Sequence, residues 1–234
     1  MIERNVTIDV LIPSRQRAAL LDHSVQSLHN TATNPERVNF LVAVDLDDPE
    51  RLLYDKIEGI LHIPVYPRYG YRQLLRYYNL LARSASNWML VWNDDALITP
   101  YYGVEGIAAA PRKGWDEVIA AEDHTVPNVL NFTGALNLFP AVSRPFYEVL
   151  GHLSLQAHVD TWIQEVARAA RIERQLFGAI QIDHMRDRID DETKRETQAA
   201  YATTSPEFLS REMQRLREQD VKKLKEALDG TDKG

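Results

Sequence analysis

Acidic residues stand directly after two apolar runs of the sequence, where carboxylates at a strand end can bind a metal ion. Asn93-Asp94-Asp95 follows the run 88–92, and Asp45 follows the run 38–44. Adjacent carboxylates repel each other unless a cation or hydrogen-bond donors offset their charge. A hard divalent ion such as Mg²⁺ or Mn²⁺ does so through oxygen ligands, and it also neutralises a diphosphate. The alternative is an acidic turn in which the carboxylates cap the next segment.

The elements that must position these residues alternate through the first half of the chain. The patterns predict strands at 7–13, 38–44, 63–66 and 88–92, and helices at 18–29, 50–61 and 71–84. This alternation predicts an α/β fold with a parallel sheet and helices on both faces. Right-handed crossovers bring the C-terminal ends of parallel strands to one sheet edge, where ligands bind. We therefore expect the loop 13–17, Asp45 and the turn 93–95 to share one crevice.

The second half of the chain has less regular patterns. They predict strands at 118–121 and 137–141 and helices at 144–150 and 159–170. Beyond residue 185 the sequence is highly charged. There, Ser205-Pro206-Glu207 predicts the start of a helix and Asp229-Gly230 its end. We expect this appended helix to dock on the body or on a partner, so it is a candidate surface for self-association.

Composition excludes several classes of protein. The 234 residues are 44% hydrophobic and 26% charged, which excludes wholesale disorder. A net charge of −7 disfavours nonspecific coating of nucleic acid. The absence of cysteine excludes disulfides, thiolate zinc sites and cysteine nucleophiles. No apolar stretch approaches the roughly 20 residues that span a bilayer, and the N-terminus lacks an apolar signal core. We expect a cytoplasmic protein without a membrane span.

Three short motifs resemble those of one enzyme family. Ile12-Pro13-Ser14-Arg15-Gln16-Arg17 resembles the "IPTYNR" segment that opens family 2 glycosyltransferases of the GT-A fold. Val44-Asp45-Leu46-Asp47-Asp48 is similar to their "VDDGS" turn, and Asn93-Asp94-Asp95 to their DXD metal motif. The order and spacing match over roughly residues 6–170. The sequence departs from the family at Gln16, at Asn93, at Tyr78-Asn79 and in lacking a glycine after Asp45.

The resemblance implies a GT-A (Rossmann-like) fold, with a mixed, mostly parallel sheet flanked by helices. It implies a nucleotide-binding half, 1–100, and an acceptor-binding half, 101–185, followed by a charged helical extension, 186–234. The implied activity moves a sugar from a nucleotide-sugar donor, a UDP-sugar, onto an acceptor hydroxyl. The acceptor class stays open. Trp115 and the turn 101–103 are candidates for stacking on an acceptor ring.

Residue roles follow from the same resemblance. The implied donor-binding residues are Pro13, Ser14, Arg17, Asp45, Asn93 and Asp94. Arg68 and Arg72 are candidates for contacting the diphosphate, and the alternative for Arg72 is a solvated helix face. Asp95 and His184 are the implied ligands of Mn²⁺ or Mg²⁺. Asp160 is the implied general base, which takes the proton of the acceptor hydroxyl.

Each of these side chains also has a structural alternative. Arg17 could be a solvated arginine at a helix start, Asp45 a carboxylate bonded to its own turn, and His184 a core histidine. Asp160 could cap its helix, with Thr161 and Gln164 completing a capping box.

Two further functions fit the sequence. A nucleotidyltransferase uses a related α/β sheet, but it usually needs a glycine-rich loop after the first strand, and residues 14–17 contain no glycine. A catalytically silent GT-A-like module, which assembles with partners through its C-terminal helix, is compatible with Asn93 in the DXD position.

Overall fold

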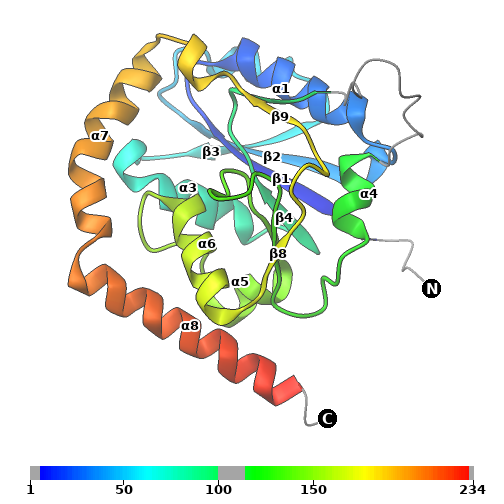
Figure 1. The fold of residues 1–234 in the computed structure, drawn as a ribbon. Helices are drawn as coiled ribbons and strands as arrows, with labels where there is room; N and C mark the ends of the chain where they lie inside the picture. Colours follow the sequence, from blue (N-terminus) through cyan, green and yellow to red (C-terminus); the bar gives the residue numbers. More distant parts are fainter. Residues whose placement is uncertain (1–5, 100–113, 232–234) are drawn as a thin grey trace.

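Parallel pairing joins the four strands of the N-terminal half into one side of a seven-stranded sheet (Figure 1). They are β1 (Ile8–Ser14), β2 (Val38–Asp45), β3 (Ile60–Val65) and β4 (Trp88–Val91), in the spatial order β3-β2-β1-β4. The structure, a computed structural model, describes residues 6–99 and 114–231. The predicted parallel sheet of this half is confirmed, and the C-terminal ends of β1, β2 and β4 lie at one edge.

Three shorter strands extend the sheet beyond β4. β7 (Ala141–Ser143) is antiparallel to β4, and β6 (Val129–Asn131) is antiparallel to β7 and parallel to β8 (Glu173–Gln175). β5 (Ala96–Ile98) and β9 (Ile182–His184) form a separate antiparallel pair. The sheet is therefore mixed and mostly parallel, as predicted.

Helices cover both faces of the sheet because the side chains of β1 alternate between two apolar cores. Leu11 belongs to the core formed with α3 (Leu74–Ala82), α5 (Arg144–Leu150) and α6 (Val159–Ala170). Val10 and Ile12 belong to the core on the opposite face, formed with α1 (Ala18–Thr31) and α4 (Trp115–Ala120).

Two segments of the second half differ from the predictions. The strand predicted at 118–121 is wrong, because this stretch lies largely in α4, where Trp115 and Ile119 are one helical turn apart and both buried. The strand predicted at 137–141 begins only at Ala141. The side-chain amide of Asn137 donates to the carbonyl of Leu130 at 3.0 Å, which fixes the segment before β7 as a loop.

The helix predicted at 50–61 is shorter than expected. α2 covers only Arg51–Tyr54, and β3 begins at Ile60. Gly59, with φ of +79°, adopts the left-handed conformation that glycine tolerates, and the chain turns there into the strand.

The C-terminal part consists of two helices, α7 (Glu192–Phe208) and α8 (Arg211–Thr231). The helix start predicted at 205–207 is wrong, because Pro206 lies in the last turn of α7. α8 packs against α5 and α6, and the indole of Trp162 donates to the buried carboxylate of Asp220 at 3.1 Å. No helix within the described residues has the length and apolar composition to cross a membrane.

α7 docks on the start of α6 through aromatic and polar contacts. The ring of His158 stacks on Tyr201 with 4.8 Å between centroids. Nε2 of His158 lies 3.2 Å from the hydroxyl of Thr204. Because burial lowers the pKa of His158, the docked state favours the neutral imidazole.

Acidification is therefore expected to weaken the docking of α7. A histidine whose pKa is lower in the native state contributes stability above its unfolded pKa of 6.5, and that stability is lost as the pH falls. Thermal unfolding should show a larger fall in Tm between about pH 7.5 and about pH 5.5 for the wild type than for His158→Gln. His23→Gln, which replaces an exposed histidine of α1, is the control and should behave as the wild type does. An equal fall in wild type and His158→Gln would refute this role.

Candidate functional site

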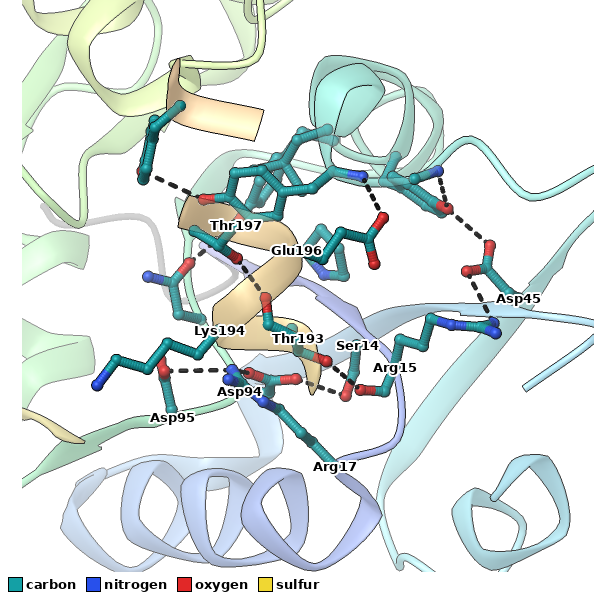
Figure 2. A pocket seen from close by; sticks show the side chains of 18 of the residues that line it. Ser14, Arg15, Arg17, Asp45, Asp94, Asp95, Thr193, Lys194, Glu196 and Thr197 are labelled. Atoms are coloured by element: carbon teal, nitrogen blue, oxygen red, sulfur yellow. Dashed lines mark hydrogen bonds and ion pairs between the residues drawn. The ribbon is translucent and has the colours of Figure 1, made fainter. Parts of the chain in front are cut away.

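The ends of β1, β2 and β4 border one cavity, which is open to solvent (Figure 2). Pro13, Ser14, Asp45 and the turn Asn93-Asp94-Asp95 all line it. The expected crevice at the sheet edge is therefore present.

Asp45 lies at one end of this cavity and is held from two sides. The hydroxyl of Tyr77, on α3, donates to Oδ1 at 2.7 Å, and Nη1 of Arg15 lies 3.3 Å from Oδ2. Burial raises the pKa of Asp45, and the Tyr77 hydrogen bond and Arg15 act in the opposite direction. Asp45 is therefore bonded to side chains from other parts of the chain. The alternative, a carboxylate bonded to its own turn, does not describe it.

Arg17 joins the acidic turn to the start of α1. Its Nη1 lies 3.0 Å from Oδ1 of Asp94 and 3.2 Å from Oδ2 of Asp95. The hydroxyl of Ser14 donates to the second oxygen of Asp94 at 2.7 Å. Arg17 is only 8% exposed, so it is not a solvated helix-start arginine. Both oxygens of Asp94 are occupied within the protein, and burial raises the pKa of this carboxyl.

Asp95 faces His184 across the β5–β9 pair. Strand pairing sets Ala96 opposite His184, and this brings Nε2 of His184 to 3.1 Å from Oδ1 of Asp95. Nδ2 of Asn93 lies 3.4 Å from the same nitrogen. Burial alone would raise the pKa of Asp95, but His184 and Arg17 hold it below its usual value.

Asp95 and His184 have the donor chemistry of a divalent-metal site. A carboxylate oxygen and an imidazole nitrogen side by side suit Mn²⁺, and Mg²⁺ also binds through one or two carboxylates. Among residues 6–99 and 114–231, no group of three or more His, Asp or Glu side chains is arranged to hold a metal ion. The residues therefore fit an ion only when a ligand such as a diphosphate supplies further oxygens.

Asp160 lines the same cavity from the start of α6. The N-cap residue of this helix is His158, and no side chain caps it. Oδ1 of Asp160 accepts from the backbone amide of Thr161 at 2.8 Å, while Nε2 in the side chain of Gln164 donates to the carbonyl of Ala135 at 3.3 Å. The capping-box alternative for Asp160 is therefore wrong.

Two residues that the sequence predicts at the site lie outside the cavity. Arg72, in the short helix η2 (Tyr71–Gln73), is exposed and borders a separate surface pocket, whereas Arg68 lines the main cavity. The placement of Arg72 at the donor site is corrected accordingly. Trp115 is a core residue whose indole donates to the carbonyl of Leu28 at 2.8 Å, so it offers no stacking face. The turn 101–103 lies outside the described residues.

Sequence reasoning missed the contribution of α7. Residues from its first three turns line the cavity opposite the strand ends: Thr193, Lys194, Glu196, Thr197 and Tyr201. The one local signal was Asp191, whose side chain accepts from the amide of Lys194 at 2.7 Å and caps the helix.

No protein-family model matches the chain, and the comparison with curated proteins finds no match. Solved structures do match. A mannosyltransferase from Pyrobaculum calidifontis, PcManGT, solved in complex with GDP-Man and Mn²⁺, is 12% identical, with a TM-score of 0.51. The match covers 94% of this chain and 86% of that chain.

The S. aureus protein TarS, residues 1–349, gives a second match in its complex with UDP. Its identity is 12% and its TM-score 0.55, over 92% of this chain and 69% of that chain. A further structure of the same TarS fragment matches with a TM-score of 0.53. The chain therefore has a GT-A-like fold, the α/β fold of glycosyltransferases. The expectation drawn from the three short motifs is confirmed at the level of the fold.

Proposed function

We propose that the protein is a glycosyltransferase that moves a sugar from a nucleotide-sugar donor to an acceptor hydroxyl. The observation that carries this proposal is the meeting of Asp45, Asp95 and Asp160 at one cavity, although two of them come from the ends of different strands, β2 and β4, and the third from the first turn of the distant helix α6. One fold can host many activities, so the proposal rests on the residues of the site and not on the fold alone.

In this proposal Asp45 recognises the base of the donor. Its carboxylate accepts the ring N–H of uracil, and the bonds from Tyr77 and Arg15 fix its orientation. Guanine also presents a ring N–H. The complexes of TarS with UDP and of PcManGT with GDP-Man make both nucleotides reasonable probes. UDP is the nucleotide we propose.

Asp95 and His184 would hold Mn²⁺ or Mg²⁺ together with the donor diphosphate. The ion supplies positive charge that stabilises the diphosphate as it departs. Arg17 keeps Asp94 paired and oriented beside Asp95.

Asp160 is the proposed general base. The acceptor oxygen forms a bond to the anomeric carbon, and the bond from that carbon to the phosphate oxygen breaks. The electron pair of the broken bond remains on the diphosphate, and the proton of the acceptor hydroxyl goes to the carboxylate of Asp160. Such a base contributes when it lies within hydrogen-bond reach of the hydroxyl.

Thermal unfolding with UDP and Mn²⁺ tests the donor site. A ligand present at a hundred-fold excess over its Kd stabilises the native state by about 2.7 kcal/mol. For a chain of this size that corresponds to a rise in Tm of about 5–10 °C. Mn²⁺ without nucleotide should give a much smaller rise, because the side chains provide an incomplete ligand set. No rise with UDP or GDP at millimolar Mn²⁺ would refute the proposal.

The loop after β1 argues against a nucleotidyltransferase. Holding a triphosphate there would require free backbone amides. The amide of Gln16 donates to Asp48 at 2.9 Å, and that of Arg17 to the hydroxyl of Tyr54 at 3.3 Å. A glycosyltransferase releases UDP from UDP-sugars, whereas a nucleotidyltransferase turns over a nucleoside triphosphate. A catalytically silent module does neither, so measuring both reactions distinguishes the three alternatives.

A further inference from the structure

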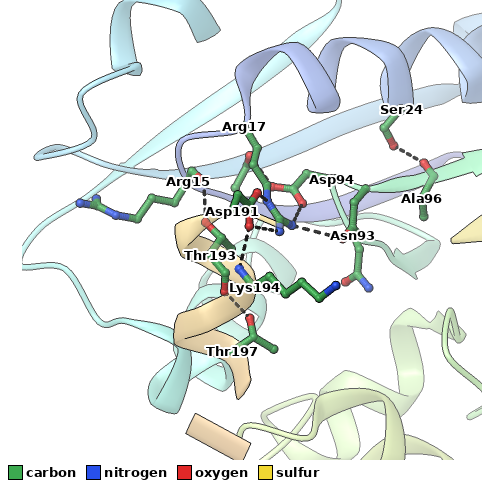
Figure 3. A network of polar contacts seen from close by, with 12 residues as sticks. Arg15, Arg17, Ser24, Asn93, Asp94, Ala96, Asp191, Thr193, Lys194 and Thr197 are labelled. Carbon is green, nitrogen blue, oxygen red and sulfur yellow. Dashed lines mark hydrogen bonds and ion pairs between the residues drawn. The ribbon is translucent and has the colours of Figure 1, made fainter. Parts of the chain in front are cut away.

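α7 is fixed to the cavity through the same arginine that holds the acidic turn. Asp191, the cap of α7, binds Nε of Arg17 at 2.7 Å and Nη2 at 2.9 Å (Figure 3). The hydroxyl of Thr193 donates to the carbonyl of Arg15 at 3.2 Å. The first turn of the helix therefore has a defined position over the end of β1.

The arginines that line the cavity already have anionic partners. Arg17 is paired with Asp94, Asp95 and Asp191. Arg15 pairs with Asp45 and Asp47, and Arg68 with Glu196 on α7. These pairs leave the arginine charges largely compensated before any ligand binds.

Lys194 differs from these arginines. Its side chain extends from α7 toward Asp95 in Figure 2 and toward Asn93 in Figure 3. It lines the cavity, and it forms no ion pair with any residue in the described ranges 6–99 and 114–231. An ammonium group on a flexible stem is a common phosphate ligand that acts as a point charge.

We propose that Lys194 binds the diphosphate of the nucleotide donor, from the side of the cavity opposite the strand ends. This inference rests on the proposed function and extends the donor site to the C-terminal segment. Lys194 adds the positive charge that the paired arginines do not offer, beside the turn where Asp95 and His184 lie. Asp191 is the positioning residue, because it fixes the turn of α7 that carries Lys194.

The test is calorimetric binding of UDP with Mn²⁺ to the wild type and to Lys194→Met. Loss of one charged contact should weaken UDP binding by about 10- to 100-fold. The affinity for uridine, measured by NMR titration, should be unchanged because uridine has no phosphate. Lys194→Arg should restore most of the UDP affinity. Arg195→Met, which removes an exposed cation next to Lys194 on the same helix, should bind UDP as the wild type does.

Each other outcome has a definite meaning. Wild-type UDP affinity in both Lys194→Met and Lys194→Gln would overturn the inference while leaving the proposed function intact. Equal losses of UDP and uridine affinity would also overturn it, since that result indicates a structural role. If the wild type binds neither UDP nor GDP, the proposed function fails and this inference fails with it.

Discussion

Asp160→Asn is expected to reduce kcat by about 10²- to 10⁴-fold, the usual contribution of a general base. Asparagine has nearly the same shape, and its carbonyl oxygen can still accept from the amide of Thr161, as Asp160 does at 2.8 Å. What it cannot do is take a proton from the acceptor hydroxyl. The substitution should therefore change the chemical step and leave the position of α6 unaltered.

The measurement is sugar transfer to the acceptor, together with UDP binding on the same preparations. The affinity for UDP with Mn²⁺ should remain close to the wild-type value, because Asp160 acts on the acceptor. Asp229→Asn, an exposed acid of α8, is the control for loss of a carboxylate elsewhere on the chain. A kcat within a few-fold of the wild type in Asp160→Asn would remove this residue from the mechanism.

Asp95→Asn is expected to lose Mn²⁺-dependent binding of UDP by about 100-fold or more. Loss of a residue that only supports a metal ligand typically costs 10- to 100-fold in metal affinity, and Asp95 is itself the proposed ligand. The fold should persist because Arg17 keeps its contacts with Asp94 and Asp191.

Calorimetry with and without Mn²⁺ measures this effect, and thermal unfolding checks that the variant is folded. Asp183→Asn is a matched control, since Asp183 precedes His184 in β9 and its side chain points to the other side of the strand. It should keep metal-dependent binding. If folded Asp95→Asn still binds UDP more tightly with Mn²⁺ than without, the metal assignment is wrong.

Three strands of the parallel half, β1, β2 and β4, could be predicted because they are continuous apolar runs that are buried almost throughout. Residues of β1 and β2 are almost all buried, and their strand ends carry the polar side chains. The structure of residues 118–121 was harder to predict. Val118 and Ile119 have high strand propensity, whereas the packing of Trp115 and Ile119 in the core selects a helix. Proline normally marks a helix start, and Pro206 instead lies just before a helix end.

The residues of the candidate site also divide into those that the sequence could predict and those that it could not. Asp45, Asp94 and Asp95 could be placed together from topology alone, since parallel strands share an edge. The contribution of α7 could not, because the pair Arg17–Asp191 joins residues 174 positions apart. No periodicity or short motif encodes a contact of that range. Only the completed packing of α7 against η2 and α6 brings Lys194 to the cavity.

The span between Arg17 and Asp191 has a consequence for biosynthesis. The strand ends leave the ribosome early, but the wall that α7 provides cannot exist until translation has passed residue 191. Closing so long a chain segment carries an entropic cost, which the contacts of α7 with the rest of the protein must offset. A nascent chain released before that point would carry the acidic residues of the sheet edge without the helix that covers them.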